Sequence, residues 1–168
     1  MDESTLDALA QARGETRAAY ENRARIYRHI YEELAAELGA ERAAAVMSRA
    51  IRRRGEEVAE AYRAAAAAAD LDEVARVFVD SSACGGELFE PGVESREEGA
   101  VVLRMTACPL VDAWRADGLA PGEVDRMCEI ASAFDYGTFE GAGLTLEFLD
   151  RQACPGSTRC LLKVSLPR

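Results

Sequence analysis

The sequence predicts an α+β fold: a helical N-terminal half, then a small antiparallel sheet of about four strands covered by helices. Three observations lead to this prediction. Apolar residues recur every three or four positions up to about residue 80, as on one face of a helix. Beyond residue 81, short apolar runs resemble strands, and two helix-like runs begin at prolines. The 168 residues suit a single domain, with a helical region (1–80) and an α+β region (81–168).

The helical half divides at residues that commonly end or begin helices. The first helix carries one apolar stripe, made of Tyr20, Tyr27, Tyr31, Leu34 and Leu38. Gly39 ends this helix, as a glycine past the last turn often does. A second helix runs into six alanines at 64–69, which are strong helix formers. Asp70 then caps a third, short helix.

The second half alternates strands and helices. Four strands are expected, at residues 88–93, 100–105, 144–148 and 160–166. A charged turn joins the first two strands. Pro109 and Pro121 open two helices between the strand pairs, because proline is favoured at the first helical position. These helices are expected to end near Gly118 and Phe139.

Charge and composition narrow the classes of partner. The net charge is −10 and the pI about 4.7, which argues against nucleic acid, since a phosphate backbone demands a basic face. No stretch reaches the apolar length of a membrane span, and the start is acidic without an apolar segment. We therefore expect a cytoplasmic protein with a small-molecule substrate. In that compartment the five cysteines are not expected to be disulfide staples.

Cys108 is the most informative residue, because Pro109 places it at or beside a helix N-cap. Unsatisfied backbone N–H groups and the positive end of the helix dipole favour the thiolate there. The alternative is a buried cysteine that packs as a small hydrophobe. Asp112, four residues on, is a candidate partner on the same helix face.

Cys128 and Asp135 form a second candidate pair. Seven residues are two helical turns, which puts both on one face, roughly 10 Å apart along the axis. An aspartate on an apolar stripe costs energy unless it is paired, although near a helix end it can also reach water. Cys160 begins the last strand, and its six-residue spacing from Cys154 fits no standard zinc knuckle. The only histidine, His29, lies off the tyrosine stripe, so a Cys-His dyad is not indicated.

These elements together resemble the L-2-amino-thiazoline-4-carboxylic acid hydrolase-like family. The resemblance covers roughly residues 85–168. It rests on the run from Arg104 to Pro109, then Trp114, Gly118-Leu119, Cys128 with Asp135, the run from Leu144 to Arg151, and Cys160. It implies a small bacterial, cytoplasmic protein that opens a five-membered ring by hydrolysis at carbon. The chain departs from the family pattern in the turn at 154–159, which is usually glycine-rich, and by adding Cys84 and Cys154.

Three functions remain open at this point. In the first, Cys108 is the nucleophile and Asp135 the base, with Cys128 beside them. Arg104 would then bind a substrate carboxylate, and Trp114, Tyr136 and Cys160 would line the site.

In the second, Cys108, Cys128 and Cys160 bind zinc or a similar ion, with Asp135 or water as the fourth ligand. In the third, the domain is a non-catalytic sensor of vinyl-reductase-like type. The long N-terminal helices could serve a homodimer in that case.

Overall fold

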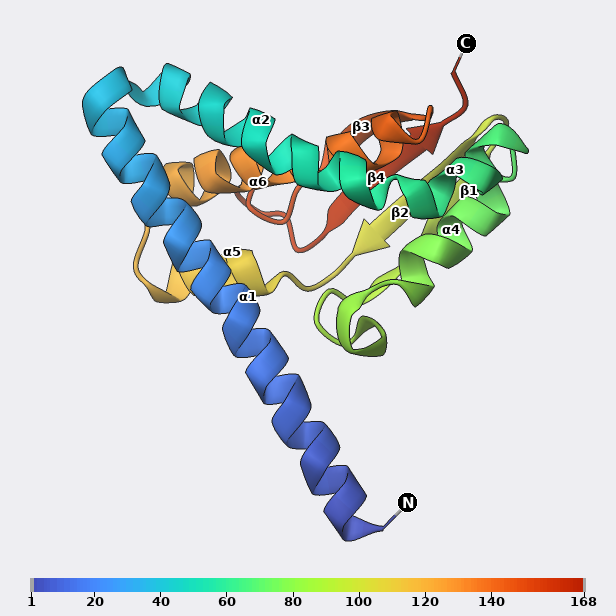
Figure 1. Ribbon diagram of the computed structural model, residues 1–168, viewed down its shortest axis with the longest axis horizontal. Helices are drawn as coiled ribbons and strands as arrows, with labels where there is room; N and C mark the ends of the chain where they lie inside the picture. The colour runs from blue at the N-terminus through green and yellow to red at the C-terminus, as the bar shows by residue number, and fades with distance from the viewer. Residues whose placement is uncertain (1, 168) are drawn as a thin grey trace.

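The computed structural model describes residues 2–167, apart from the side chain of residue 3. Six α-helices and a four-stranded sheet confirm the α+β prediction (Figure 1). The elements in chain order are α1 (Glu3–Leu38), α2 (Ala40–Val58), α3 (Glu60–Ala67), α4 (Leu71–Asp80), a 3-10 turn η1 (Ala83–Gly86), β1 (Pro91–Glu97), β2 (Ala100–Met105), α5 (Pro109–Ala116), α6 (Pro121–Gly141), β3 (Thr145–Asp150) and β4 (Cys160–Ser165).

Most element boundaries follow the expected local chemistry. Gly39 separates α1 from α2 with φ +82°, a conformation that glycine adopts without a Cβ clash. The carboxylate of Asp70 accepts a hydrogen bond of 2.9 Å from the backbone N–H of Glu73 and so caps α4. Pro109 and Pro121 stand in the first turns of α5 and α6, as predicted.

The first strand begins later than the sequence predicts. Residues 88–90 do not join the sheet, because the N–H groups of Phe89 and Glu90 both donate to the carbonyl of Gly86, at 3.2 and 2.7 Å. This turn delays β1 until Pro91. The strand prediction at 88–93 was therefore displaced by three residues, while the other three strands lie close to their expected positions.

The sheet has strand order β1-β2-β4-β3, and every neighbouring pair is antiparallel. Its inner face is apolar and buried by helices, through side chains that include Val101, Leu103, Leu162 and Val164. The outer face is charged: Lys163 pairs with Glu97 across the strands at 2.6 Å. The helices thus cover one face of the sheet and leave the other to water.

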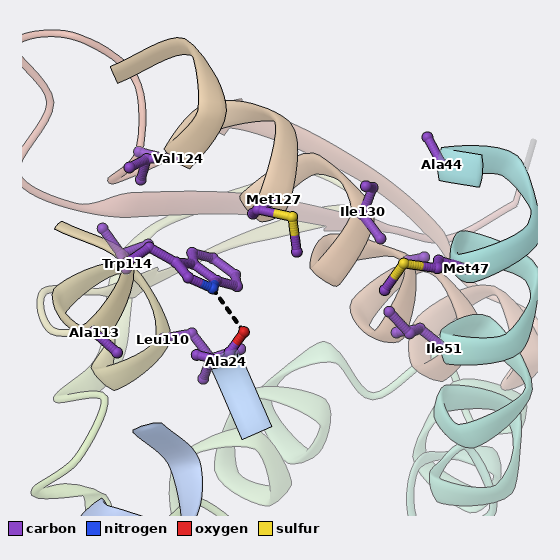
Figure 2. Close-up of a cluster of buried hydrophobic side chains, with 13 residues drawn as sticks. Ala24, Ala44, Met47, Ile51, Leu110, Ala113, Trp114, Val124, Met127 and Ile130 are labelled. Atoms are coloured by element: carbon purple, nitrogen blue, oxygen red, sulfur yellow. Dashed lines mark hydrogen bonds between the residues drawn. The ribbon is translucent and has the colours of Figure 1, made fainter. Parts of the chain in front are cut away.

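Two hydrophobic clusters make up the core, and α6 contributes to both. The first lies among α1, α2, α5 and α6 and is centred on Trp114 (Figure 2). The indole N–H of Trp114 donates to the carbonyl of Ala24 in α1, at 2.9 Å. The second cluster lies between the sheet and α3, α4 and the end of α6, around Phe139. Helix α6 therefore ties the helical layer to the sheet.

Helices α2 and α6 approach each other closely through two glycines. A Cβ on Gly55 would stand 2.1 Å from the carbonyl oxygen of Phe134, and one on Gly137 would stand 2.2 Å from that of Arg52. Real Cβ atoms do not come so close to backbone oxygens, so only glycine fits at both positions. The hydroxyl of Thr138 adds a contact of 3.4 Å to the carbonyl of Gly55.

In the part of the chain that the structure describes, no helix combines the length and the apolar character required to cross a membrane.

Replacing Gly137 with alanine should destabilise the fold by roughly 2–4 kcal/mol, because the new methyl group must separate two packed helices. Gly14→Ala is the matched control: this glycine lies within α1 with nothing within 4 Å of its Cβ position, so the change should stabilise by up to about 1 kcal/mol. Urea unfolding of both variants measures the difference. Equal stability of the two variants would contradict this description of the α2–α6 contact.

Candidate active site

Four side chains that the sequence singles out come from three elements around the junction of the two cores. Cys108 stands at the N-cap of α5, and Cys128 and Asp135 lie on one face of α6. Cys160 is the first residue of β4, directly opposite Met105 in β2. Cys108 and Cys128 pack against the first cluster, while Cys160 belongs to the second.

The electrostatic effects among these groups place them close together. Charges on Cys160 and Cys108 raise the pKa of the Cys128 thiol, after the larger effect of burial. A charge on Asp135 likewise raises the pKa of both Cys108 and Cys160, again after burial. These electrostatic effects link the four predicted residues, which we call the cysteine cluster.

Cys108 itself differs from expectation. Its backbone is extended at the N-cap, as predicted, but burial raises the pKa of its thiol. The N–H groups of Val111 and Leu110 oppose this shift, although neither reaches full hydrogen-bond geometry. The prediction of an activated thiolate is therefore wrong for the resting protein, because desolvation outweighs the helix terminus.

The other two cysteines of the cluster are also held as thiols. Burial raises the pKa of Cys128 to about 12 and that of Cys160 to about 12. The backbone N–H of Gln152 donates to the sulfur of Cys160 at 3.3 Å and opposes the shift there. At neutral pH the three sulfurs are thus uncharged.

Asp135 is the member of this cluster whose pKa lies near neutral pH. Burial raises the pKa of its carboxyl to about 7, and its own backbone N–H opposes the shift only in part. By surface area, however, Asp135 is partly exposed. Tyr62, buried in α3, also lies close, because a charge on Asp135 adds to the raised pKa that burial gives this phenol. Sequence patterns did not indicate that Tyr62 lies near Asp135.

A second group of polar residues borders the cluster. Arg151, which follows β3, donates to the carboxylate of Asp125 in α6 at 2.8 Å. Cys154 donates to the same carboxylate at 3.7 Å. The guanidinium also lowers the pKa of Cys128, against the larger effect of burial, so it faces the cluster. The side chain of Arg151 is only 21% exposed. Its place in a loop explains why sequence patterns did not indicate it.

Three residues proposed as substrate contacts lie elsewhere or are engaged. Arg104 alternates with Met105 along β2, so it points to the outer face of the sheet, where Glu94 lies at 3.6 Å. Trp114 is fully buried and bonded to α1, which makes it a core anchor. Tyr136 packs against Phe148 with ring centroids 5.7 Å apart.

The two weaker sequence candidates also fall outside the cluster. The carboxylate of Asp112 is about half exposed and faces Arg17 at 3.7 Å, although its charge does raise the pKa of Cys108. His29 is 69% exposed and contacts Glu32 at 3.2 Å.

The cysteine cluster does not match a metal site as it is arranged. Within residues 2–167, no group of three or more His, Cys, Asp or Glu side chains is placed to hold a metal ion. Zinc binding by Cys108, Cys128 and Cys160, the second of the three functions left open by the sequence, stays a prediction.

Two shallow surface hollows lie away from the cluster. One, of about 490 Å³, is lined by residues 68–72, 96–97 and 100–101. The other, of about 370 Å³, is lined by Val79, residues 85–87, Glu90 and Pro91. Neither borders Cys108 or Asp135. Cys108, Cys128 and Cys154 are each partly exposed, whereas Cys160 is buried.

The sequence of this chain matches the model of a known protein family. The sequence model of the family described as L-2-amino-thiazoline-4-carboxylic acid hydrolase matches residues 19–161. The chain belongs to this family. The match confirms the resemblance and extends it, because it includes most of the N-terminal helices as well as the region from residue 85 onward.

One solved structure of another protein shares this fold. Subunit 3 of a trafficking protein particle complex from Naegleria fowleri, covalently bound to palmitic acid, superposes with a TM-score of 0.56. It shares 11% identity over 90% of this chain and 96% of its own, which shows the fold alone. The phenol-responsive sensory domain of the transcription activator PoxR, with phenol, gives a TM-score of 0.48 and 15% identity over 85% and 73% of the two chains. No curated protein sequence matches the chain.

The raised pKa of Asp135 makes folding stability depend on pH. Because the folded pKa of about 7 exceeds the unfolded value of 3.8, the unfolded chain releases this proton first as pH rises. The wild type should lose stability between about pH 4 and 7. Asp135→Asn should not lose stability over this range. Its free energy of unfolding should exceed that of the wild type by roughly 2–4 kcal/mol at pH 7.5.

Urea unfolding of the wild type and Asp135→Asn at pH 5, 6, 7 and 7.5 measures this difference. Asp72→Asn, on the exposed first turn of α4, is the control for the loss of one carboxyl group. Parallel stability profiles for wild type and Asp135→Asn would show that the carboxyl is solvated.

Proposed function

We propose that this chain is a small-molecule hydrolase that attacks a C=N or acyl carbon through Cys108. One observation supports this most: a thiol at a helix N-terminus shares a desolvated cluster with a carboxyl whose pKa is about 7. A base is most effective when its pKa lies near the working pH. The family to which the chain belongs adds the reaction class, hydrolytic opening of a thiazoline ring.

The proposed chemistry begins with the neutral thiol of Cys108 and the ionised carboxylate of Asp135. Asp135, in its ionised form, accepts the proton of Cys108 directly or through one water as the sulfur adds to the electrophilic carbon. The N–H groups of Leu110 and Val111 stabilise negative charge that develops at the helix start. In a thiazoline the ring C–S bond then breaks, and the ring sulfur leaves with the proton. Water hydrolyses the remaining Cys108 adduct and restores the thiol.

Arg151 is a better candidate than Arg104 for binding a substrate carboxylate. It is mostly buried and its charge acts on Cys128, whereas Arg104 lies on the outer face of the sheet. The hydrogen bond to Asp125 uses one of the five guanidinium N–H donors of Arg151. The remaining donors can bind a ligand carboxylate in a bidentate manner at the same time.

Binding without catalysis is the second candidate function. The raised pKa values of the three thiols keep the sulfurs uncharged, and apolar side chains pack against Cys108 and Cys128. Uncharged sulfurs among apolar side chains suit the capture of a hydrophobic molecule as well as they suit a reaction.

We further propose a cytoplasmic homodimer built on α1. The N-terminal part of α1 projects from the body in Figure 1, with Leu6 50% exposed and Leu9 39% exposed. Both leucines continue the apolar stripe of α1, in which Tyr20 and Tyr27 further along the helix pack against the first cluster. A second copy of the chain would cover the two leucines.

Leu6→Glu should therefore yield a monomer in analytical ultracentrifugation. A mass equal to that of a dimeric wild type would contradict this interface.

Cys108→Ser should lower the hydrolysis of 2-amino-thiazoline-4-carboxylate at least about a thousand-fold, because serine in the same site lacks a comparably acidic nucleophile. Cys84→Ser, in the η1 turn, should keep wild-type activity. Steady-state kinetics measures the activity of both variants, and elemental analysis measures their metal content. Full activity of Cys108→Ser, or loss of a stoichiometric metal with activity, would exclude the nucleophile.

The pH profile tests the role of Asp135. Since the base must be ionised, kcat/KM should rise with pH through about 7 and level off above it. Asp135→Asn should lower kcat/KM by about 10²–10⁴-fold and remove this rise. A wild-type profile that is flat from pH 5.5 to 8.5 would contradict the assignment.

A further inference from the structure

Gln152 carries the one buried side-chain polar atom, among those of residues 2–167, that lacks a hydrogen-bond partner within the protein. The residue is 8% exposed and lies in the loop between β3 and β4. Its unpartnered atom is the amide oxygen Oε1. Such an acceptor costs about 1–3 kcal/mol when it is buried, and a methionine of similar size would avoid this cost.

Every other polar group of Gln152 is engaged. Its backbone N–H donates to the sulfur of Cys160 at 3.3 Å, and its carbonyl accepts from the guanidinium of Arg115 at 2.7 Å. The side-chain Nε2 donates to the carbonyl of Thr106 at 3.5 Å. The residue is thus held on three sides, and the acceptor Oε1 and the second N–H of the side-chain amide are left for another molecule.

The orientation of the amide follows from its partner. The carbonyl of Thr106 can only accept a hydrogen bond, so the amide nitrogen must face it. A flipped amide would set two oxygens against each other. Oε1 therefore presents an acceptor, and it has no way to donate.

The position of Gln152 connects it to the reacting groups. Its backbone touches the sulfur of Cys160, and Thr106 lies two residues before Cys108. The side chain consequently spans from the start of β4 to the segment that leads into α5. Gln152 is therefore joined by hydrogen bonds to Cys160 itself and to the segment that precedes Cys108.

We propose that Oε1 of Gln152 accepts a hydrogen bond from an N–H group of the substrate, and that it selects cyclic amidines over esters and thioesters. This inference rests on the proposed function, because it concerns the same site. An amidine carries N–H donors next to its electrophilic carbon, whereas the reacting group of an ester or thioester carries none. A site that contains a buried polar group discriminates strongly against ligands that leave it unpaired.

The test compares two substrates in two matched variants. Gln152→Met removes the acceptor at similar volume, and Gln11→Met makes the same change on the exposed face of α1. With 2-amino-thiazoline-4-carboxylate, Gln152→Met should lower kcat/KM by about 10–100-fold. With the thioester S-phenyl thioacetate it should lower kcat/KM less than threefold, and Gln11→Met should match the wild type on both. An equal loss on both substrates, as expected if Gln152 only holds a structural water, would overturn the proposal.

Calorimetric binding of the same thiazoline separates this inference from the proposed function. If the wild type binds the thiazoline but does not hydrolyse it, the hydrolase proposal fails. The role of Gln152 would still be supported if Gln152→Met weakens binding by tenfold or more. Equal binding by the two proteins, or no binding by the wild type, would overturn the role of Gln152.

Discussion

The close approach of α2 and α6 is the constraint on which the rest of the structure depends. Gly55 and Gly137 allow backbone contact between the helices, and side chains on either residue would push them apart. Gly137 follows Cys128 by nine residues, which at 100° per residue is two and a half turns, so the two residues lie on opposite faces of α6. The glycine face of α6 therefore packs on α2, and the opposite face carries Cys128 and Asp135 toward the sheet and α5. A shift of α6 would alter both hydrophobic clusters and the cysteine cluster together.

Desolvation determines the chemistry of the cluster more than any single contact. Burial is the largest effect on Cys108, Cys128, Cys160 and Asp135, and it favours the uncharged form of each. At Cys108 the N–H groups at the start of α5 oppose this effect without overcoming it. Arg151 supplies the neighbouring positive charge that acts on Cys128.

The sequence predicts those features that depend on local chemistry. The N-cap position of Cys108 follows from Pro109, and the shared face of Cys128 and Asp135 follows from their spacing on one helix. The face on which Arg104 lies was not predictable, because apolar side chains at three successive positions, 101–103, leave both faces of β2 apolar. The pKa of Cys108 depends on burial by distant elements, and Gln152 lies in a loop whose partners come from α5, β4 and the end of β2.

The proposed site depends on Asp135, a carboxyl group whose pKa is raised to about 7. The most direct measurement is an NMR titration of the Asp135 carboxyl carbon in ¹³C-labelled protein, assigned with Asp135→Asn. A midpoint near pH 7 is the expected result. A midpoint near 4, the ordinary value for an aspartate, would mean that the carboxyl is hydrated and that the cysteine cluster lacks its base.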